Sequence, residues 1–287
     1  MFKEMKIRVF VGLMIVFAVV AEWILTMYDL PEIHKRLISD FVTFETVALL
    51  FFGYYFYKQK TPLHTVVSEG REKISVLSIL GIALIFNVFS LTSYWFYLYI
   101  QYSLVTLNPF VILHPTGSPF LLIFMMITST LTAPISEEFV FRGLLLNRLI
   151  KKTNMWLGIL ISSLAFASVH MQWEKLFATF LFGVIASLIY LKTKSLFVPI
   201  LLHIVHNAIV FIQTSIFPAW TESLFLASSD DIHVNVVLKS TLLVISFLLM
   251  IFIIVYLARS IYSDRRKVAE KSQPEEFPFQ PETISSQ

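Results

Sequence analysis

The stretch TLLVISFLLMIFIIVYLA, residues 241–258, decides the fold class. It carries no charged residue, and about 20 mostly apolar residues in a helix suffice to cross the hydrocarbon core of a bilayer. The whole chain shares this character: 57% of its 287 residues are hydrophobic and only 14% are charged, and its mean hydropathy is +0.76. A soluble domain of ordinary composition is excluded.

Apolar runs of spanning length recur along the chain. They cover residues 9–28, 41–57, 74–100, 120–133 and onward to 150, 155–171, 175–193, 196–217 and 234–258. Each run is read as a helix, because a single segment in lipid must satisfy its backbone groups internally. The sequence therefore predicts an all-α, polytopic membrane bundle of about eight transmembrane helices, with a first helix that is retained.

The positive charges predict how this bundle lies in the cell membrane. With the N-terminus inside, five segments near residues 1–8, 58–73, 148–154, 192–194 and 259–287 fall inside and hold most Lys and Arg. The outside segments hold only Lys35, Arg36 and Lys175. This asymmetry follows the positive-inside rule, so we expect a multi-pass protein with both termini in the cytoplasm. The net charge of +3 is then a topology signal, and no nucleic-acid partner is expected.

The sequence predicts four regions. Residues 1–119 hold the first three helices, 120–217 hold helices four to seven as a candidate catalytic core, 218–262 hold the eighth helix, and 263–287 are expected to form a disordered cytoplasmic tail because they are polar and contain proline. The chain has no cysteine. Disulfides, cysteine–zinc sites and thiol catalysis are therefore excluded.

Several polar residues in or near the helices have ordinary explanations. Glu22 and Glu45 are expected near the outer interface, and Lys239 is expected to extend its amine toward the membrane surface. Asn87 is expected to form a hydrogen bond to a neighbouring helix. Four histidines are expected in solvated loops, at positions 34, 64, 114 and 233.

The first informative cluster is PISEEFVFRG, residues 134–143. Glu138 and Arg142 are four residues apart with the acid on the N-terminal side, which is the favourable order for an ion pair on a helix. Burial makes that pairing close to compulsory. Glu137 points about 100° away around the helix, so it is left as the candidate general base. Pro134 is expected to break the helix, with Ser136 as the N-cap of a second segment.

Two further clusters contain histidine. FASVH ends in His170, and LLHIVHNAIV places His203 and Asn207 on one face with His206 about 60° aside. His170 could simply lie at the membrane interface, and the other three side chains could serve hydrogen bonding between helices. Counting at about 1.5 Å per residue places His203 nearer its cytoplasmic helix end than His170, so the clusters are not expected at one depth.

Together the clusters describe a reaction centre for hydrolysis. A carboxylate and a histidine can deprotonate a water molecule, while a histidine and an asparagine amide can donate hydrogen bonds to a developing oxyanion. Such a set suits cleavage of an amide bond by activated water, without a covalent intermediate.

The same residues carry a family resemblance. EEFVFR (137–142), FASVH (166–170) and HIVHN (203–207) resemble the EExxxR, FxxxH and HxxxN motifs of the CPBP family. These are the CAAX-prenyl-protease and bacteriocin-processing intramembrane proteins, also called ABI or Rce1-type glutamic endopeptidases. The motifs occur in the family's order, within residues 120–217.

The resemblance implies a helical-bundle protease in which Glu137 acts with His170 on water. It implies that His203 and Asn207 form the oxyanion site, and that Glu138 and Arg142 complete the first motif. His206 is an additional histidine that could compete for the oxyanion role. The implied partners are membrane lipid and a peptide or membrane-protein substrate, such as a bacteriocin or signalling-peptide precursor.

Three alternatives stay open at this point. Glutamate and histidine are also zinc ligands, so a zinc-dependent protease is possible, although the chain has no HExxH pair. A proton-coupled transporter could use Glu137 and the histidines as a relay. A bacteriocin-immunity or scaffold protein could keep the same residues as a non-catalytic polar core. We expect a site without a metal or other cofactor.

Overall fold

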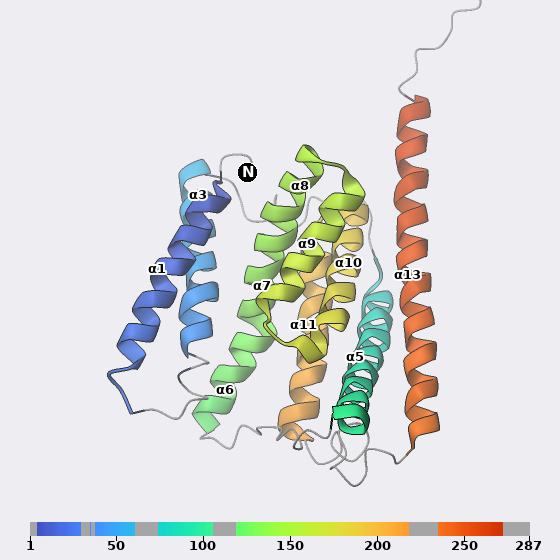
Figure 1. Cartoon of the computed structure of the whole chain (residues 1–287). Helices are drawn as coiled ribbons and strands as arrows, with labels where there is room; N and C mark the ends of the chain where they lie inside the picture. Colours follow the sequence, from blue (N-terminus) through green and yellow to red (C-terminus); the bar gives the residue numbers. More distant parts are fainter. Residues whose placement is uncertain are drawn as a thin grey trace, which may run out of the picture.

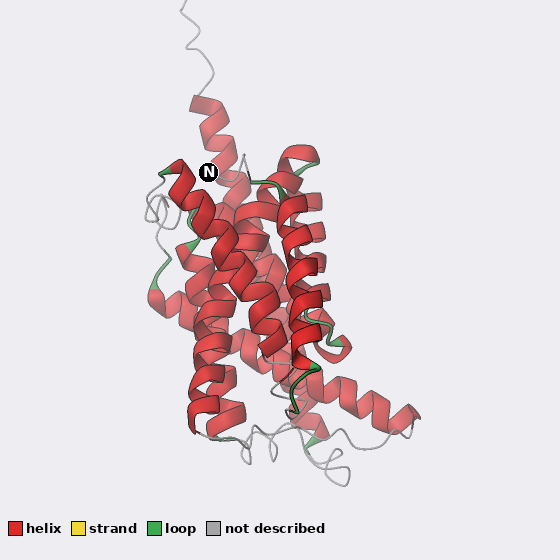
Figure 2. Cartoon of the chain, turned by 90° about the vertical axis from the view of Figure 1, so that its left-hand side faces the viewer, coloured by secondary structure: helices red, strands yellow, loops and turns green. Residues whose placement is uncertain are grey.

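The computed structural model describes residues 5–29, 35, 38–60, 74–105, 119–217 and 235–271, and all regular structure in these residues is helical (Figure 2). The helices stand side by side as a bundle, with the pair α1 and α3 at one edge and α13 at the other (Figure 1). The all-α membrane bundle predicted from the sequence is confirmed. The four loop histidines, at positions 34, 64, 114 and 233, lie outside the described residues.

Eight helical rods make up the described part of the bundle, in agreement with the predicted number. They are α1 (Ile7–Leu25); η1 (Phe41–Thr46) with α3 (Val47–Gln59); α5 (Val76–Val105); the rod of α6 (Pro119–Ile127), η2 (Thr128–Thr132), α7 (Ala133–Glu138), η3 (Phe139–Leu146) and α8 (Asn147–Lys152); α9 (Met155–Val169); η4 (Trp173–Lys175) with α10 (Leu176–Thr193); α11 (Phe197–Phe211) with η5 (Ile212–Ile216); and α13 (Val236–Lys271). Six of the eight are long and apolar enough to cross a membrane.

The outer surface of the bundle is apolar, as lipid contact requires. Large side chains such as Val237 and Leu77 are about four-fifths exposed, although the helices that carry them pack inward with other residues. A protein in water would rarely present such long apolar faces. The chain is a multi-pass membrane protein.

Helix α10 occupies the centre of the described bundle and packs against α9, α11, α13 and η3. Its residues Ala186, Leu188 and Ile189 are fully buried. Gly183 makes the close approach to α9 possible, because a Cβ at this position would lie 2.9 Å from the Cβ of Ser163. A larger residue would push the two helices apart.

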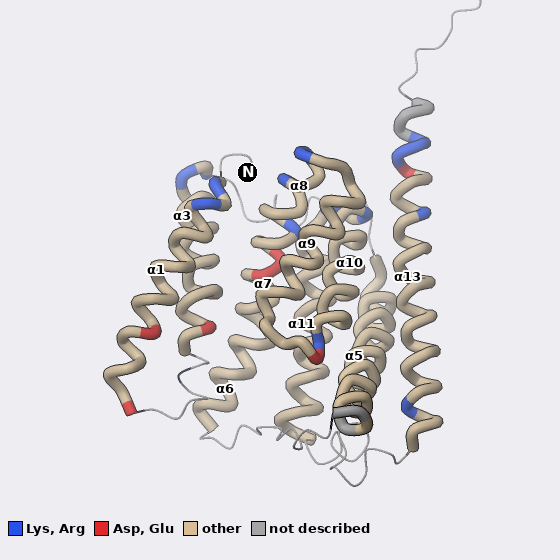
Figure 3. The backbone as a smooth tube through the Cα atoms, in the orientation of Figure 1, with Lys and Arg blue, Asp and Glu red and all other residues tan. Residues whose placement is uncertain are grey.

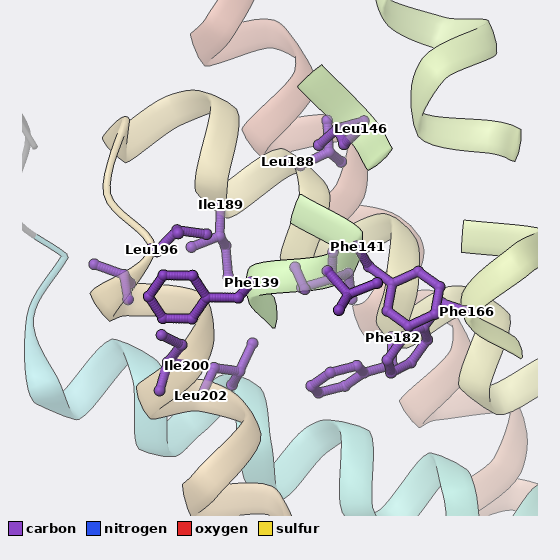
Figure 4. Close-up of a cluster of buried hydrophobic side chains, with 14 of the residues drawn as sticks. Phe139, Phe141, Leu146, Phe166, Phe182, Leu188, Ile189, Leu196, Ile200 and Leu202 are labelled. Atoms are coloured by element: carbon purple, nitrogen blue, oxygen red, sulfur yellow. The ribbon is translucent and has the colours of Figure 1, made fainter. Parts of the chain in front are cut away.

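Aromatic side chains fill the space between α10 and the rod that carries the first motif (Figure 4). Phe141 meets Phe166 edge-on at 5.2 Å between ring centroids, and Phe166 stacks on Phe182 at 6.0 Å. Such ring pairs are rigid and well packed. They form an apolar wall beside the polar residues of the three motifs.

The rod from Pro119 to Lys152 is continuous, so the predicted helix break at Pro134 is wrong. Pro134 lies in the first turn of α7, and Ser136 lies within that helix and is not its N-cap. Proline removes one backbone donor and crowds the preceding turn. The wider π-helical turn of η2 directly precedes α7, and this local widening relieves the crowding without ending the rod.

The last helix is longer than expected. α13 continues to Lys271, so the predicted start of a disordered tail at residue 263 is wrong. Residues 264–271 (DRRKVAEK) are mostly good helix formers, and Lys192 Nζ donates to Asp264 Oδ2 at 2.6 Å, which ties this end of α13 to α10. The rest of the expected tail, residues 272–287, lies outside the described residues.

Candidate active site

Glu137 lies between the two histidines that the sequence placed in separate clusters. Its Oε2 atom is 3.9 Å from His170 Nε2 and 3.8 Å from His203 Nε2. The side chain is only 15% exposed, and Oε2 accepts no hydrogen bond within the described part of the chain. Both distances are too long for a direct hydrogen bond, and separations of this kind suit a bridging water.

Glu138 points to the other side of the helix and holds two partners. Arg142 Nη1 donates to Glu138 Oε1 at 2.8 Å, and both side chains are almost completely buried. His203 Nδ1 lies 3.0 Å from the same oxygen. An ionised carboxylate only accepts hydrogen bonds, so His203 Nδ1 is the donor. The Glu138–Arg142 ion pair expected from the spacing is present, and it also orients His203 so that Nε2 is directed at Glu137.

Arg142 is fixed by three elements. Besides its bond to Glu138, Nη2 donates to the Gly183 carbonyl at 3.3 Å, and the guanidinium lies over the Phe166 ring at 4.4 Å from the centroid. A buried guanidinium needs such partners, because its desolvation is otherwise uncompensated. Arg142 therefore connects the first motif to α9 and α10.

His170 follows the last residue of α9, and its ring orientation is set by its own helix. Nδ1 lies 2.8 Å from the Phe166 carbonyl oxygen, and a carbonyl can only accept, so Nδ1 carries the proton. In the neutral ring Nε2 is then an acceptor that faces Glu137. Two acceptors 3.9 Å apart suit a water that donates a hydrogen to each. Phe166 supports the ring edge-on at 4.8 Å.

Asn207 and His206 have different surroundings on α11. Asn207 Nδ2 donates to the Ser129 carbonyl at 2.8 Å, which leaves its second N–H available. His206 is buried and packs against Phe86 and Phe182, with ring centroids 4.7 Å and 5.7 Å away. Its Nδ1 has no hydrogen-bond partner among the described residues. His206 thus lies beside Glu137, His170 and His203, and its Nδ1 forms no hydrogen bond to them.

A cavity of about 310 Å³ adjoins these residues. His170, His203, His206 and Asn207 all line it. Its remaining walls come from α5, α9, the η4 segment, α10, the end of α11 and η5. α9 ends and α10 begins at a level that the neighbouring helices α5, α6 and α11 pass beyond (Figure 1), so the α9–α10 connection is recessed relative to the ends of these helices.

The expectation that the clusters lie at different depths is wrong. His170 and His203 both lie within 4 Å of the same oxygen of Glu137. Counting residues assumed that every helix begins at the membrane surface. In the α10–α11 connection Lys194 is exposed, but Thr193, Ser195 and Leu196 are only 0%, 5% and 1% exposed. The start of α11 thus packs partly against the bundle, and its seventh residue, His203, already lies at the same Glu137 oxygen as His170.

Two polar residues outside the motifs are covered by neighbouring helices. Glu45 is buried and accepts a hydrogen bond from Thr132 Oγ1, so its assignment to the outer interface is wrong. Lys239 is 3% exposed and lies over the Trp95 ring, so the expected extension to the surface is also wrong. In both cases another helix supplies the partner, which sequence position alone does not reveal.

Asn87 behaves as the sequence predicted. Its Nδ2 donates to Gln213 Oε1 at 3.0 Å, and Gln213 Nε2 donates back to Asn87 Oδ1 at 2.9 Å. The pair joins α5 to η5 beside the cavity, which Asn87 lines.

Among the described residues, no group of three or more His, Cys, Asp or Glu is arranged as a metal site. Absence of a metal from the reaction stays a prediction.

Comparisons with known proteins bear on the region that carries the motifs. Residues 119–209 match the family model described as "Type II CAAX prenyl endopeptidase Rce1-like". Over 89 residues the chain is 36% identical to "Putative membrane peptidase YdiL" of Bacillus subtilis (strain 168), with 31% of this chain and 36% of that protein covered. The family resemblance inferred from the three motifs is confirmed for this region.

Two further relatives match similarly. One is "Uncharacterized 24.3 kDa protein" of Escherichia coli, 38% identical over 86 residues, which are 28% of this chain and 40% of that protein. The other is "Membrane-embedded CAAX protease MroQ" of Staphylococcus aureus (strain USA300), 37% identical over 89 residues, which are 29% and 36%. The match spans well under half the length of each curated relative. No solved structure matches the chain at a significant level.

Proposed function

We propose that the protein is an intramembrane endopeptidase in which Glu137 activates water for hydrolysis of a peptide bond. The observation that carries the proposal is Glu137 Oε2, a buried acceptor without a hydrogen-bond partner among the described residues, 3.8–3.9 Å from two histidine nitrogens. Leaving a buried carboxylate oxygen unpaired is costly. A site that holds and deprotonates water accounts for that cost.

In the proposed reaction, a water molecule donates one hydrogen to Glu137 Oε2 and one to His170 Nε2. Glu137 takes the proton as the water oxygen attacks the carbonyl carbon of the peptide bond. The proton then passes to the amide nitrogen, the C–N bond breaks, and the new carboxylic acid gives its remaining proton to the leaving amine, so that a carboxylate and an ammonium group are released. Glu137 ends in its starting state, so the cycle needs no other reactant.

The developing oxyanion is assigned to His203 and Asn207. His203 in its imidazolium form donates from Nε2, while its Nδ1 donates to Glu138 Oε1 at 3.0 Å. Asn207 donates the N–H that Ser129 does not use. Donors held in place before reaction are effective because they need no reorganisation as charge develops.

The family match and the names of the relatives support a peptide or membrane-protein substrate. Lys and Arg gather at the end of the bundle that holds the described N-terminal residues (Figure 3), which supports cytoplasmic termini. The cavity extends to Gln172 and Lys175 at the α9–α10 connection, which faces away from that end of the bundle (Figure 1). We infer that substrate reaches it from within the membrane or from the outer face.

The test is a proteomic comparison of membranes from cells that express the wild type or Glu137→Ala. A substrate accumulates as precursor in the variant and its cleaved product disappears. Glu22→Ala is the matched control, because Glu22 is an exposed helix glutamate that bonds Ser39, and it should leave the peptide pattern unchanged. Identical patterns for all three proteins, at equal expression, would favour a non-catalytic scaffold or immunity role.

A further inference from the structure

The cavity beside the proposed catalytic residues extends well beyond them. From His170 and His203 it continues along α5, where Asn87 and Tyr94 line it, to Gln172 before η4. Amide and hydroxyl groups therefore stand at several points of a cavity whose volume is about 310 Å³. Cavities of this size with a few convergent polar groups are typical of ligand sites. The proposed reaction uses only one end of it.

Lys175 gives the far part of the cavity a defined charge. Among the described residues that line the cavity, it is the only Lys, Arg, Asp or Glu. Glu174 precedes it in the chain but is not one of the lining residues. Lys175 is the last residue of η4 and the N-cap of α10, so the recessed α9–α10 connection carries it directly to the cavity.

Among the described residues the amine of Lys175 forms no ion pair, although the carboxylate of Glu174 attracts it through space. Its Nζ lies 5.7 Å from the centroid of the Tyr94 ring, an arrangement that holds an ammonium group by attraction to the ring face. Such a contact leaves the three N–H donors available. The side chain is exposed, so a bound group can reach it.

We propose that Lys175 forms an anion-binding subsite, and that the protein prefers peptides with an Asp or Glu side chain close to the scissile bond. The proposal rests on the function proposed above, because it places the peptide in the same cavity. The carboxylate would accept a charge-assisted hydrogen bond from Nζ, while Asn87, Gln172 and Tyr94 offer groups for the peptide backbone. Such a charged contact is stronger than a neutral one.

The test measures peptide binding to full-length Glu137→Gln protein in detergent micelles, so that no peptide is consumed. The probes are nine-residue apolar peptides with both ends capped and an uncharged fluorophore, differing only in Asp, Asn or Lys at the central position. We expect the Asp peptide to bind about tenfold more tightly than the Asn peptide, the effect of one charged hydrogen bond. Adding Lys175→Gln should remove this preference, and Lys175→Glu should favour the Lys peptide.

Lys58→Glu is the matched control. Lys58 Nζ also lies over a tyrosine ring, 5.8 Å from the centroid of Tyr54, far from the cavity lining. The Lys58→Glu substitution changes the charge by the same amount as Lys175→Glu and should leave the preference for the Asp peptide intact. A fourth peptide, with the central Asn but a free C-terminal carboxylate, separates a chain end from an acidic side chain.

Three results would overturn the subsite: equal binding of the Asp and Asn peptides, binding of neither, or loss of the preference in Lys58→Glu as well. A preference shown only by the free C-terminal carboxylate would overturn the side-chain assignment. Cleavage of the same peptides by the wild type is measured separately. If Lys175 decides binding but nothing is cleaved, the subsite stands and the proposed function fails.

Discussion

Removal of the Glu138 carboxylate should destabilise the protein more than any other single change at the site. Glu138 is 0% exposed and its Oε1 accepts from Arg142 Nη1 at 2.8 Å. In Glu138→Gln the amide oxygen can still accept a hydrogen bond, but the guanidinium loses its carboxylate counter-ion and keeps only neutral partners there, the Gly183 carbonyl at 3.3 Å and the Phe166 ring among them. Breaking a buried pair in this way costs about 3–5 kcal/mol of unfolding free energy. Arg142→Met should cost less, because Glu138 keeps the His203 donor.

Replacing both members should restore much of this stability. In Glu138→Leu combined with Arg142→Met neither charge of the pair is left buried without its partner, and apolar replacement of a buried pair is often neutral. We expect the double variant to lose about half as much unfolding free energy as Glu138→Gln, or less. Its turnover should nevertheless stay low, because His203 Nδ1 has lost the oxygen that orients the ring.

The assay is reversible unfolding of full-length protein in mixed micelles, followed by tryptophan fluorescence, with turnover measured on the same preparations. The single variants Glu138→Leu and Arg142→Met and the double variant that combines them form a cycle that isolates the coupling between the residues. If the losses of unfolding free energy in the two single variants simply add in the double variant, the argument that an unpaired buried charge causes the loss is refuted. Full recovery of turnover in the double variant would refute the positioning of His203 by Glu138.

Three further predictions concern the cavity and its surroundings. His203→Ala and Asn207→Ala should each lower turnover about 10²–10³-fold, whereas His206→Ala should lower it less; a larger loss for His206 would show that the oxyanion donor on α11 is assigned wrongly. Turnover in detergent should survive EDTA and 1,10-phenanthroline, with no stoichiometric metal by elemental analysis; activity that is lost on chelation and restored only by zinc would contradict a metal-free site. Asn87→Leu should lower the unfolding free energy by about 1 kcal/mol. Adding Gln213→Leu should lower it little further, since each amide group is the hydrogen-bond partner of the other. Additive losses of free energy in the same unfolding assay would contradict that.

The fold was largely predictable because the bilayer restricts it. Eight apolar runs gave eight rods, and the backbone of each satisfies its own hydrogen bonds. The details that failed depend on neighbours. Two examples are the π-helical turn before Pro134 and the burial of Ser195 and Leu196. Both arise from the packing of one helical rod against another, and no local sequence pattern predicts them. The predicted end of the last helix was set by the polarity of the sequence alone, and α13 continues past it to Lys271.

The site was predictable in its members more than in its geometry. Spacing along one helix was enough to pair Glu138 with Arg142 and to identify Glu137 as the carboxylate without an ion-pair partner on that helix. The bond from His203 to Glu138 could not be predicted, because it depends on the placement of α11 against α7. Glu45 was misjudged for the same reason, since its partner Thr132 lies on another rod. Lys175 gave no local signal as a cavity residue.

The central claim is that Glu137 is the base, and Glu137→Gln tests it most directly. Glutamine has nearly the same shape, and Oε2 has no hydrogen-bond partner to lose among the described residues, so the free energy of unfolding should not fall. Turnover should be abolished, because a neutral amide cannot take a proton from water. The measurement is cleavage by purified wild type and variant, at equal unfolding free energy, of the substrate found by membrane proteomics. Wild-type turnover by Glu137→Gln would contradict the mechanism.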